Sequence, residues 1–218
     1  MKVIVCRAVL FDMDGVLVDS TPCIERHWSD WAKQHGKDLA EITKVAHGRK
    51  TIETLRIIAP ELDIAAEAAA LSALGETDLD GVSVIPGAND LLASLPAEQW
   101  TIVTSSPRAV ALARLNHCGL PIPKTLITAD DIQRGKPAPD CFLTGAAALH
   151  CPPENCVVVE DAPSGIDAAL AAGMQVIAVV STHTQAQLQA ASAVVNCIPD
   201  IEARLREGEI ELRIESCT

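Results

Sequence analysis

Residues 3–20 read VIVCRAVLFDMDGVLVDS, a run of mostly apolar side chains that ends in two acids and a glycine. From Val3 to Phe11 the apolar character is nearly continuous rather than alternating, which predicts one strand covered on both faces, as in a parallel sheet. Asp12 and Asp14 follow the carboxyl end of that strand, where an open α/β sheet places its ligands. The segment therefore predicts an α/β fold with an acidic site after its first strand.

The same pattern of a short apolar run followed by a helical segment recurs along the chain. Helical patterns begin near Ser106, Pro139 and Ser164, where serine or proline suits a helix start. Alternation of strands and helices predicts a Rossmann-like parallel sheet flanked by helices and joined by right-handed crossovers. The runs that predict its further buried strands are residues 101–103, 125–127, 156–159 and 176–180.

One long segment, residues 20–82, interrupts this alternation with helical periodicity alone. Apolar residues at helical spacing predict helices around Trp28, Ile42 and Leu55, and an Ala-rich stretch predicts a fourth over residues 64–74. No strand pattern separates these segments. We therefore expect an inserted α-helical cap of four helices.

The predicted domain organisation follows from this insertion. Residues 20–82 form the helical cap domain, and residues 1–19 and 83–218 together form the α/β core. Within the core, one more strand is expected at residues 193–195. The charged segment 202–215 carries no pattern that predicts a role.

Composition excludes several classes of protein. Hydrophobic residues make up 49% of the 218 residues and charged residues 21%, which excludes a disordered chain. The net charge of −12 and the 2% aromatic content argue against nucleic-acid and membrane-surface partners. No apolar run approaches the roughly 18 residues of a membrane span, and the N-terminus lacks a signal-peptide pattern. We expect a cytoplasmic protein, either a monomer or a small homo-oligomer.

Three other predicted strand ends carry polar groups that complement Asp12 and Asp14. Thr104 and Ser105 stand just before a helix start, where hydroxyls and free N–H groups suit a phosphate oxygen. Lys136 lies between Gly135 and Pro137, and the acids Glu160 and Asp161 follow a run of valines. Taken singly, these features are also typical of a helix cap, a surface lysine and an acidic turn. Their recurrence at strand ends predicts one shared site.

The four segments stand in the order Asp12-Met13-Asp14-Gly15, Thr104-Ser105, Lys136-Pro137 and Glu160-Asp161. In this order, over about residues 3–180, the sequence resembles the haloacid dehalogenase superfamily of aspartate-dependent phosphohydrolases. The long interval between the first and second segments leaves room for a cap. With a helical cap at that place, the sequence resembles one group of the superfamily, which contains β-phosphoglucomutase, phosphoglycolate phosphatase and the sugar and polyol phosphatases.

The resemblance implies catalytic roles for Asp12, Asp14, Thr104 and Lys136. Asp12 would attack phosphorus and form an aspartyl-phosphate, and Asp14 would protonate the leaving oxygen and then deprotonate the hydrolytic water. Thr104, Ser105 and Lys136 would bind the phosphate oxygens, on which charge accumulates in the transition state. An acid at position 14 argues against C–halogen cleavage, because a halide leaves without a proton.

The resemblance also implies a Mg²⁺ cofactor, whose preference is for hard oxygen ligands. The ligands would be the Asp12 carboxylate, the Asp14 backbone carbonyl and Asp161. Glu160 would either support these ligands or reach the metal through a water molecule. A divalent ion at this place would neutralise part of the phosphate charge that opposes a carboxylate nucleophile.

Substrate specificity is expected to lie in the cap and in the segment after Asp14. His47, Arg49 and Lys50 flank a glycine and resemble the specificity loop of the sugar and polyol phosphatases, although a helix–helix turn with solvated charges has the same appearance. Asp19 either binds a sugar hydroxyl or caps the next helix. His27 is expected to be an ordinary helix residue without a converging set of ligands.

The expected function is Mg²⁺-dependent hydrolysis of a small sugar or polyol phosphate monoester, which makes a small phosphorylated metabolite the partner. The alternatives are a phosphomutase of the β-phosphoglucomutase type and a phosphoglycolate phosphatase. A third reading, a binding module that retains the fold without turnover, predicts the loss of a motif residue. Each of the four motifs is complete in this sequence.

Overall fold

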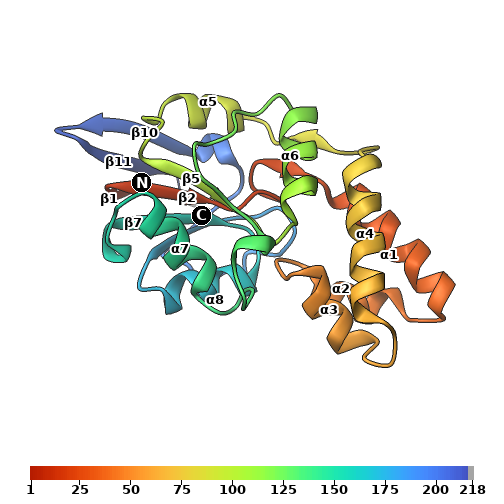
Figure 1. Ribbon diagram of the computed structural model, residues 1–218. Helices are drawn as coiled ribbons and strands as arrows, with labels where there is room; N and C mark the ends of the chain where they lie inside the picture. Colours follow the sequence, from red (N-terminus) through yellow and green to blue (C-terminus); the bar gives the residue numbers. More distant parts are fainter. Residues whose placement is uncertain (216–218) are drawn as a thin grey trace.

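The structure, a computed structural model, describes residues 1–215 and is built around a parallel sheet (Figure 1). Its strands are β2 (Ala8–Phe11), β5 (Trp100–Val103), β6 (Leu126–Ile127), β7 (Cys156–Glu160), β8 (Gln175–Val179) and β9 (Ala193–Val195). They are hydrogen-bonded in the order β6-β5-β2-β7-β8-β9, and every neighbouring pair is parallel. The predicted Rossmann-like sheet is confirmed, including the strand expected at residues 193–195.

Helices cover both faces of this sheet (Figure 1). They are α5 (Ala88–Ala93), α6 (Arg108–His117), α7 (Asp140–Ala148) and α8 (Pro163–Ala171). Along β2 the side chains alternate between two apolar clusters. Phe11 packs in the cluster that holds Leu115 of α6, and Leu10 packs in the cluster that holds Phe142 of α7. Burial on both faces explains why this strand is apolar throughout.

The expectation of a single strand from Val3 to Phe11 is wrong. The chain forms β1 (Lys2–Cys6), turns at Arg7 and enters the parallel sheet only with β2. In β1 burial alternates, since Val3 is 47% exposed and Ile4 is 3% exposed. β1 therefore belongs to a separate sheet with one face towards the core.

The partners of β1 come from the charged segment near the C-terminus. β10 (Ile201–Arg206) and β11 (Glu209–Ile214) form a hairpin, and β11 pairs antiparallel with β1. Ile210 and Leu212 of β11 are buried, and charged residues alternate with them. This two-residue period was the sequence signal for a strand, and the segment's high charge concealed it.

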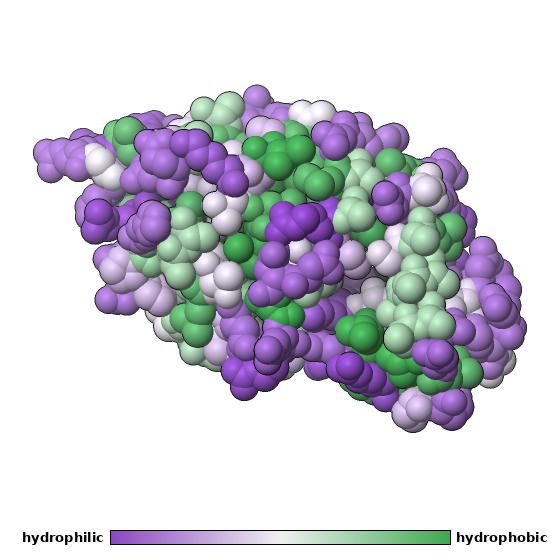
Figure 2. Space-filling model, in the orientation of Figure 1, coloured by the Kyte–Doolittle hydropathy of each residue, from purple (hydrophilic) through white to green (hydrophobic). Residues whose placement is uncertain are grey.

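The inserted segment forms the four helices expected of the cap. They are α1 (Thr21–His35), α2 (Leu39–Ala46), α3 (Thr51–Ile58) and α4 (Ile64–Thr77). Trp28, Ile42 and Leu55 meet in the apolar cluster of the cap. The Ala-rich helix α4 presents a pale, weakly hydrophobic band on the cap surface (Figure 2). Within residues 1–215, no helix has the length and apolar character needed to cross a membrane.

A two-stranded ribbon joins the cap to the core. It consists of β3 (Val18–Asp19) and β4 (Ser83–Val84), which pair antiparallel at the two points where the chain leaves and re-enters the core. We propose this ribbon as the boundary of the cap domain, residues 20–82. The last three residues of the predicted core range, 216–218, lie outside the described residues.

Candidate active site

The sequence-predicted residues Asp12, Thr104, Lys136, Glu160 and Asp161 meet at the carboxyl edge of the sheet. Asp12 follows β2, Thr104 follows β5, and the two acids stand at the end of β7. Because β5, β2 and β7 are adjacent in the sheet, their carboxyl ends lie side by side. All five residues are buried, and none is more than 5% exposed.

Lys136 joins two of the carboxylates. Its Nζ lies 2.5 Å from Asp12 Oδ1 and 2.6 Å from Glu160 Oε1. Burial raises the pKa of Asp12 to about 7, against the opposing effect of the Lys136 charge. Burial by itself lowers the pKa of Lys136, but the adjacent Asp12 and Glu160 carboxylates make the net shift upward. The ammonium group therefore stays charged beside the Asp12 carboxyl.

Asp12, Glu160 and Asp161 form an acidic cluster whose donor oxygens lie within 4.8 Å of one another. Burial and the charges of Glu160 and Asp12 raise the pKa of Asp161 well above its usual value. Thr182 Oγ1 donates a hydrogen bond to Asp161 Oδ2. Gly15 has a φ of +88°, and a Cβ there would lie 2.1 Å from Asp161 Oδ2. This buried, oxygen-only donor set fits a hard divalent cation, because an added positive charge would offset the repulsion among the carboxylates.

Glu160 has both of its oxygens engaged by the protein. Oε1 accepts from Lys136, and Oε2 accepts from the backbone N–H groups of Asp161 and Ala162, each at 2.7 Å. A Cβ at Gly165 would clash with the Glu160 carboxylate, at 1.7 Å from Oε1. The glycine thus leaves the space that this carboxylate occupies.

The Asp14 carboxylate is held by three donors, of which Arg114 and Ser106 belong to the core and Ser20 is the first residue of the cap range. Arg114 Nη1 lies 2.7 Å from Oδ1, Ser20 Oγ donates to Oδ1 at 2.6 Å, and Ser106 Oγ donates to Oδ2 at 2.9 Å. Arg114 is 4% exposed and lies on α6, on the helix face that also buries Val110. This residue was not predicted from the sequence. The signal for it was an arginine on the apolar face of a predicted helix, where a buried charge needs a partner.

A cavity of about 130 Å³ separates the cap from this edge of the sheet. Of the predicted residues, Asp12, Asp14, Thr104, Ser105, Asp161, His47 and Arg49 line it. The Ser105 hydroxyl donates to the Gly48 carbonyl at 2.7 Å, so the cap loop docks directly on the core. Burial, together with the neighbouring His183, lowers the pKa of His47.

Two predicted specificity residues, Asp19 and Lys50, have other partners and are not among the described residues that line the cavity. Lys50 Nζ donates to the Ile132 carbonyl at 2.9 Å. Asp19 Oδ1 accepts from the Thr21 backbone N–H at 3.1 Å, at the start of α1. Both side chains lie at junctions between the cap and the core.

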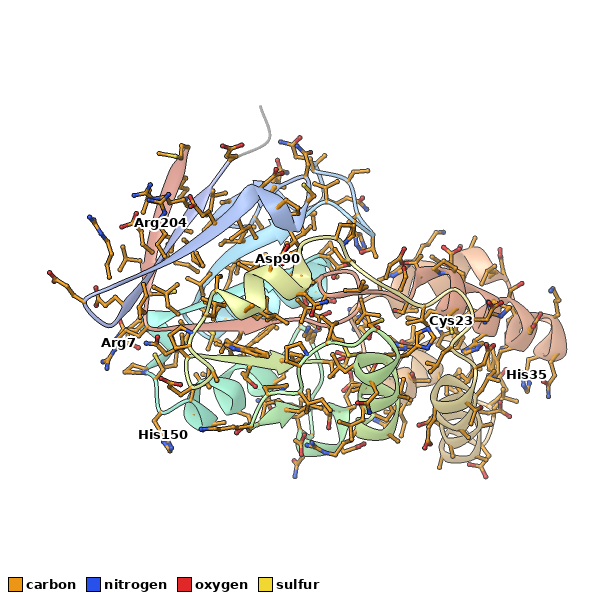
Figure 3. All side chains as sticks on the ribbon, turned by 90° about the horizontal axis from the view of Figure 1, so that it is seen from above. Arg7, Cys23, His35, Asp90, His150 and Arg204 are labelled. Atoms are coloured by element: carbon orange, nitrogen blue, oxygen red, sulfur yellow. The ribbon has the colours of Figure 1, made fainter. Side chains whose placement is uncertain are left out.

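His27 does have converging partners, contrary to expectation. Its Nε2 lies 2.9 Å from Asp78 Oδ2, and Cys23 Sγ donates to the Asp78 carbonyl at 3.2 Å. Arg26 also binds this carboxylate and, through its hydrogen bonds, lowers the pKa of Asp78. Figure 3 shows Cys23 near the junction of cap and core and His35 at the distal end of α1. The cluster ties α1 to the end of α4, and the sequence concealed it because Asp78 lies far along the chain.

Comparison with known proteins agrees with this geometry. The sequence profile of the haloacid dehalogenase-like hydrolases matches residues 6–173. Hexitol phosphatase A from Escherichia coli (strain K12) is 43% identical over 201 residues, covering 90% of this chain and 93% of that protein. Glycerol-1-phosphate phosphohydrolase 2 from Saccharomyces cerevisiae is 35% identical over 192 residues, which cover 81% of this chain and 75% of that protein. The crystal structure of β-phosphoglucomutase from Clostridium difficile superposes with a TM-score of 0.78 at 25% identity, covering 88% of this chain and 92% of that one.

Proposed function

The chain belongs to the haloacid dehalogenase-like hydrolases, and on this basis we propose that it hydrolyses a small sugar or polyol phosphate monoester with Mg²⁺ through an aspartyl-phosphate intermediate. The observation that carries the proposal is the buried ion pair of Asp12 with Lys136, in which Asp12 lines a cavity also lined by Asp14. The names of the relatives that act on hexitol and glycerol phosphates support the substrate class.

In the first step an Asp12 oxygen attacks phosphorus as the ester P–O bond breaks. The leaving alkoxide oxygen takes a proton from Asp14. Lys136 keeps a positive charge beside Asp12, which reduces the repulsion between the carboxylate and the incoming phosphate. Thr104 and Ser105 would bind the phosphate oxygens at the start of the loop that leads to α6.

In the second step a water molecule attacks phosphorus of the aspartyl-phosphate. Asp14 removes its proton, the Asp12 oxygen–phosphorus bond breaks, and inorganic phosphate leaves. Asp14 thereby regains the proton it gave up, and Asp12 returns as a carboxylate. The donors that hold the Asp14 carboxylate, Arg114, Ser20 and Ser106, fix its position for both proton transfers.

Mg²⁺ would be held by Asp12, Asp161 and the backbone carbonyl of Asp14. When bound, the ion supplies positive charge that neutralises the phosphate. Because both Glu160 oxygens already accept hydrogen bonds, we assign Glu160 to supporting Lys136 and the Asp161 backbone.

Metal binding is expected to change the pH dependence of stability. The folded pKa of Asp12 is raised from 3.8 to about 7, so the folded protein holds this proton more tightly than the unfolded chain. In metal-free protein the stability from Asp12 is full below about pH 4 and is lost as the pH rises to about 7.

We therefore expect Mg²⁺ to raise the melting temperature more at about pH 8 than at about pH 5, because protons compete for the ligands at the lower pH. Thermal melts with Mg²⁺ or EDTA measure this difference, and Asp12→Asn should reduce it. An equal Mg²⁺ effect at both pH values in both proteins would argue against the acidic cluster as the metal site.

Arg114→Met is expected to lower kcat by up to about 100-fold with little change in KM, because a misplaced proton donor slows chemistry more than binding. Steady-state kinetics on the most active substrate measure kcat and KM separately. Arg114→Lys should recover part of kcat, since an ammonium can still reach Asp14. The matched control is Arg134→Met, which removes an arginine paired with Asp140 on the surface. A rise in KM alone would mean that Arg114 binds substrate instead.

The test of the proposed function is Mg²⁺-dependent phosphate release from a panel of hexose, pentose, hexitol and glycerol phosphates, with phosphoglycolate included. Strong release from hydroxylated esters supports the proposal. Release confined to phosphoglycolate supports a phosphoglycolate phosphatase. Conversion of β-glucose 1-phosphate to glucose 6-phosphate through a bisphosphate, without phosphate release, supports the mutase that the structural neighbour represents.

A further inference from the structure

A second cluster of metal-binding residue types lies at the base of the cap, where α1 begins and α4 ends (Figure 3). Cys23, His27 and Asp78 each place one ligand atom within 4.8 Å of the other two. Cys23 is 0% exposed and His27 is 7% exposed. These two residues stand four positions apart on α1, so their side chains reach the same face of that helix. Asp78 caps the C-terminal end of α4 and meets them there.

The distances between these ligand atoms are close to those of a tetrahedral zinc site. Zinc bonds of about 2.3 Å to sulfur and about 2.0 Å to nitrogen, at the tetrahedral angle, separate the two ligand atoms by about 3.5 Å. Cys23 Sγ lies 3.6 Å from His27 Nε2. His27 Nε2 lies 2.9 Å from Asp78 Oδ2. A zinc ion between that nitrogen and that oxygen needs about 3.3 Å, so an outward shift of the carboxylate by about 0.4 Å admits it.

The types of ligand atom select a borderline-soft ion over Mg²⁺. A cysteine sulfur and an imidazole nitrogen suit Zn²⁺, whereas Mg²⁺ requires oxygen ligands such as those of Asp12 and Asp161. Hydrogen bonds from Arg26 and His27 lower the pKa of Asp78, which keeps its carboxylate charged. Three protein ligands leave the fourth tetrahedral position to a water molecule. The cluster in the cap and the cluster at the sheet edge therefore differ in metal preference.

The surroundings of the cluster support a bound ion and give it a route of entry. Arg26 Nη2 lies 2.8 Å from both Asp78 oxygens, so it can keep Oδ1 when Oδ2 turns to a metal. The Asp78 side chain is 30% exposed, and His27 lines the cavity between cap and core. On binding, the Cys23 thiol proton passes to solvent, and His27 binds through Nε2 with its remaining ring proton on Nδ1.

We propose that Cys23 Sγ, His27 Nε2 and Asp78 Oδ2 bind a Zn²⁺ ion that fastens the two ends of the cap together. α1 begins at Thr21, soon after β3, and a short segment joins Asp78 to β4. The ion therefore stabilises the cap where the chain enters and leaves it. The site uses none of the residues assigned to phosphate hydrolysis, so the inference goes beyond the proposed function and does not depend on it.

Co²⁺ spectroscopy tests the ligand set directly. Co²⁺ takes the place of Zn²⁺ in such sites, and a bound thiolate gives it a charge-transfer absorption that oxygen ligands do not give. With Mg²⁺ in excess, the wild type should show this band with one equivalent of Co²⁺, and Zn²⁺ should abolish it. Asp12→Asn should keep the band, whereas Cys23→Ser should lose it.

The matched control is Cys156→Ser in the core. Cys156 is also buried, and its Sγ donates to a backbone carbonyl, that of Pro152, at 3.4 Å. Cys23 Sγ donates in the same way to the Asp78 carbonyl at 3.2 Å. Both substitutions therefore remove a buried thiol with one such hydrogen bond, but Cys156→Ser should keep the charge-transfer band.

Zinc affinity and thermal stability supply a second readout. In competition with a chromophoric chelator, Cys23→Ser and His27→Gln should bind Zn²⁺ more than about 100-fold more weakly than the wild type, since even loss of a supporting residue costs about 10–100-fold. With excess Mg²⁺, Zn²⁺ should raise the melting temperature of the wild type and of Cys156→Ser but not of the two ligand variants.

Two results would overturn the inference. One is the absence of a thiolate band in the wild type, which is measured whether or not the variants fold. The other is a band or a zinc affinity that Cys23→Ser retains. Either result would leave the phosphatase proposal intact, because that proposal is tested by phosphate release.

Discussion

Asp12→Asn is expected to reduce phosphate release by roughly 10⁴-fold or more, because the amide is a far weaker nucleophile than the carboxylate. The fold should survive, since Lys136 keeps its contact with Glu160 at 2.6 Å. In metal-free protein at about pH 8 the variant should melt higher than the wild type, because one of three crowded buried acids becomes neutral. Phosphate release and thermal melts measure the two effects.

The matched control for this substitution is Asp131→Asn. Asp131 is also a carboxylate with several hydrogen bonds, to Thr128 and Arg108, but it lies outside the cavity. Its variant should keep wild-type kcat. Acid quenching during turnover should trap a phosphoprotein in the wild type and none in Asp12→Asn. Wild-type release by Asp12→Asn would mean that another residue is the nucleophile or that a contaminant is being measured.

Asp14→Asn is expected to lower kcat on polyol phosphates by about 10²–10⁴-fold, because an alkoxide is a poor leaving group without a proton donor. p-Nitrophenolate leaves without a proton, so the first step should persist on p-nitrophenyl phosphate. The second step still needs a base to activate water. We therefore expect a burst of nitrophenolate equal to the enzyme concentration, followed by slow turnover, in stopped-flow measurements.

The control for this prediction concerns Arg114. Asparagine at position 14 keeps hydrogen-bonding groups for Ser20 and Ser106 but removes the charge that pairs with the buried guanidinium. Because an unpaired buried charge destabilises the fold, melting curves of Asp14→Asn and of Asp14→Asn/Arg114→Met should be compared. A burst in both variants supports the acid–base role. Equal losses on both esters without a burst would argue against it.

Comparison of sequence and structure shows which kinds of contact could be predicted. The apolar runs predicted the parallel strands, and Asp12 follows one of them, where Lys136 reaches it from the loop before α7. The strand predicted from Val3 to Phe11 was wrong because alternating burial in β1 was hidden by its branched apolar residues. The hairpin of β10 and β11 was not predicted because its many charged residues obscure the two-residue period of the buried residues in β11.

The cap shows the limit of prediction from sequence most clearly. His47 and Arg49 line the cavity, whereas Lys50, which stands next to them in the sequence, binds the core at Ile132. Thr54 lies one turn along α3 from Lys50 and resembles any helical threonine in the sequence. Its burial at the cavity between cap and core is a property of the tertiary structure.

Local periodicity and chain connectivity were enough to predict the alternation of parallel strands and helices, the inserted cap and the residue types at the strand ends, but not β1 as a separate strand or the hairpin of β10 and β11. Which side chains share the cavity depends on the tertiary structure. Arg114 reaches Asp14, and His27 reaches Asp78, across intervals that no local pattern spans. Such contacts depend on how helices pack against one another, and packing is decided by the burial of side chains from distant parts of the chain.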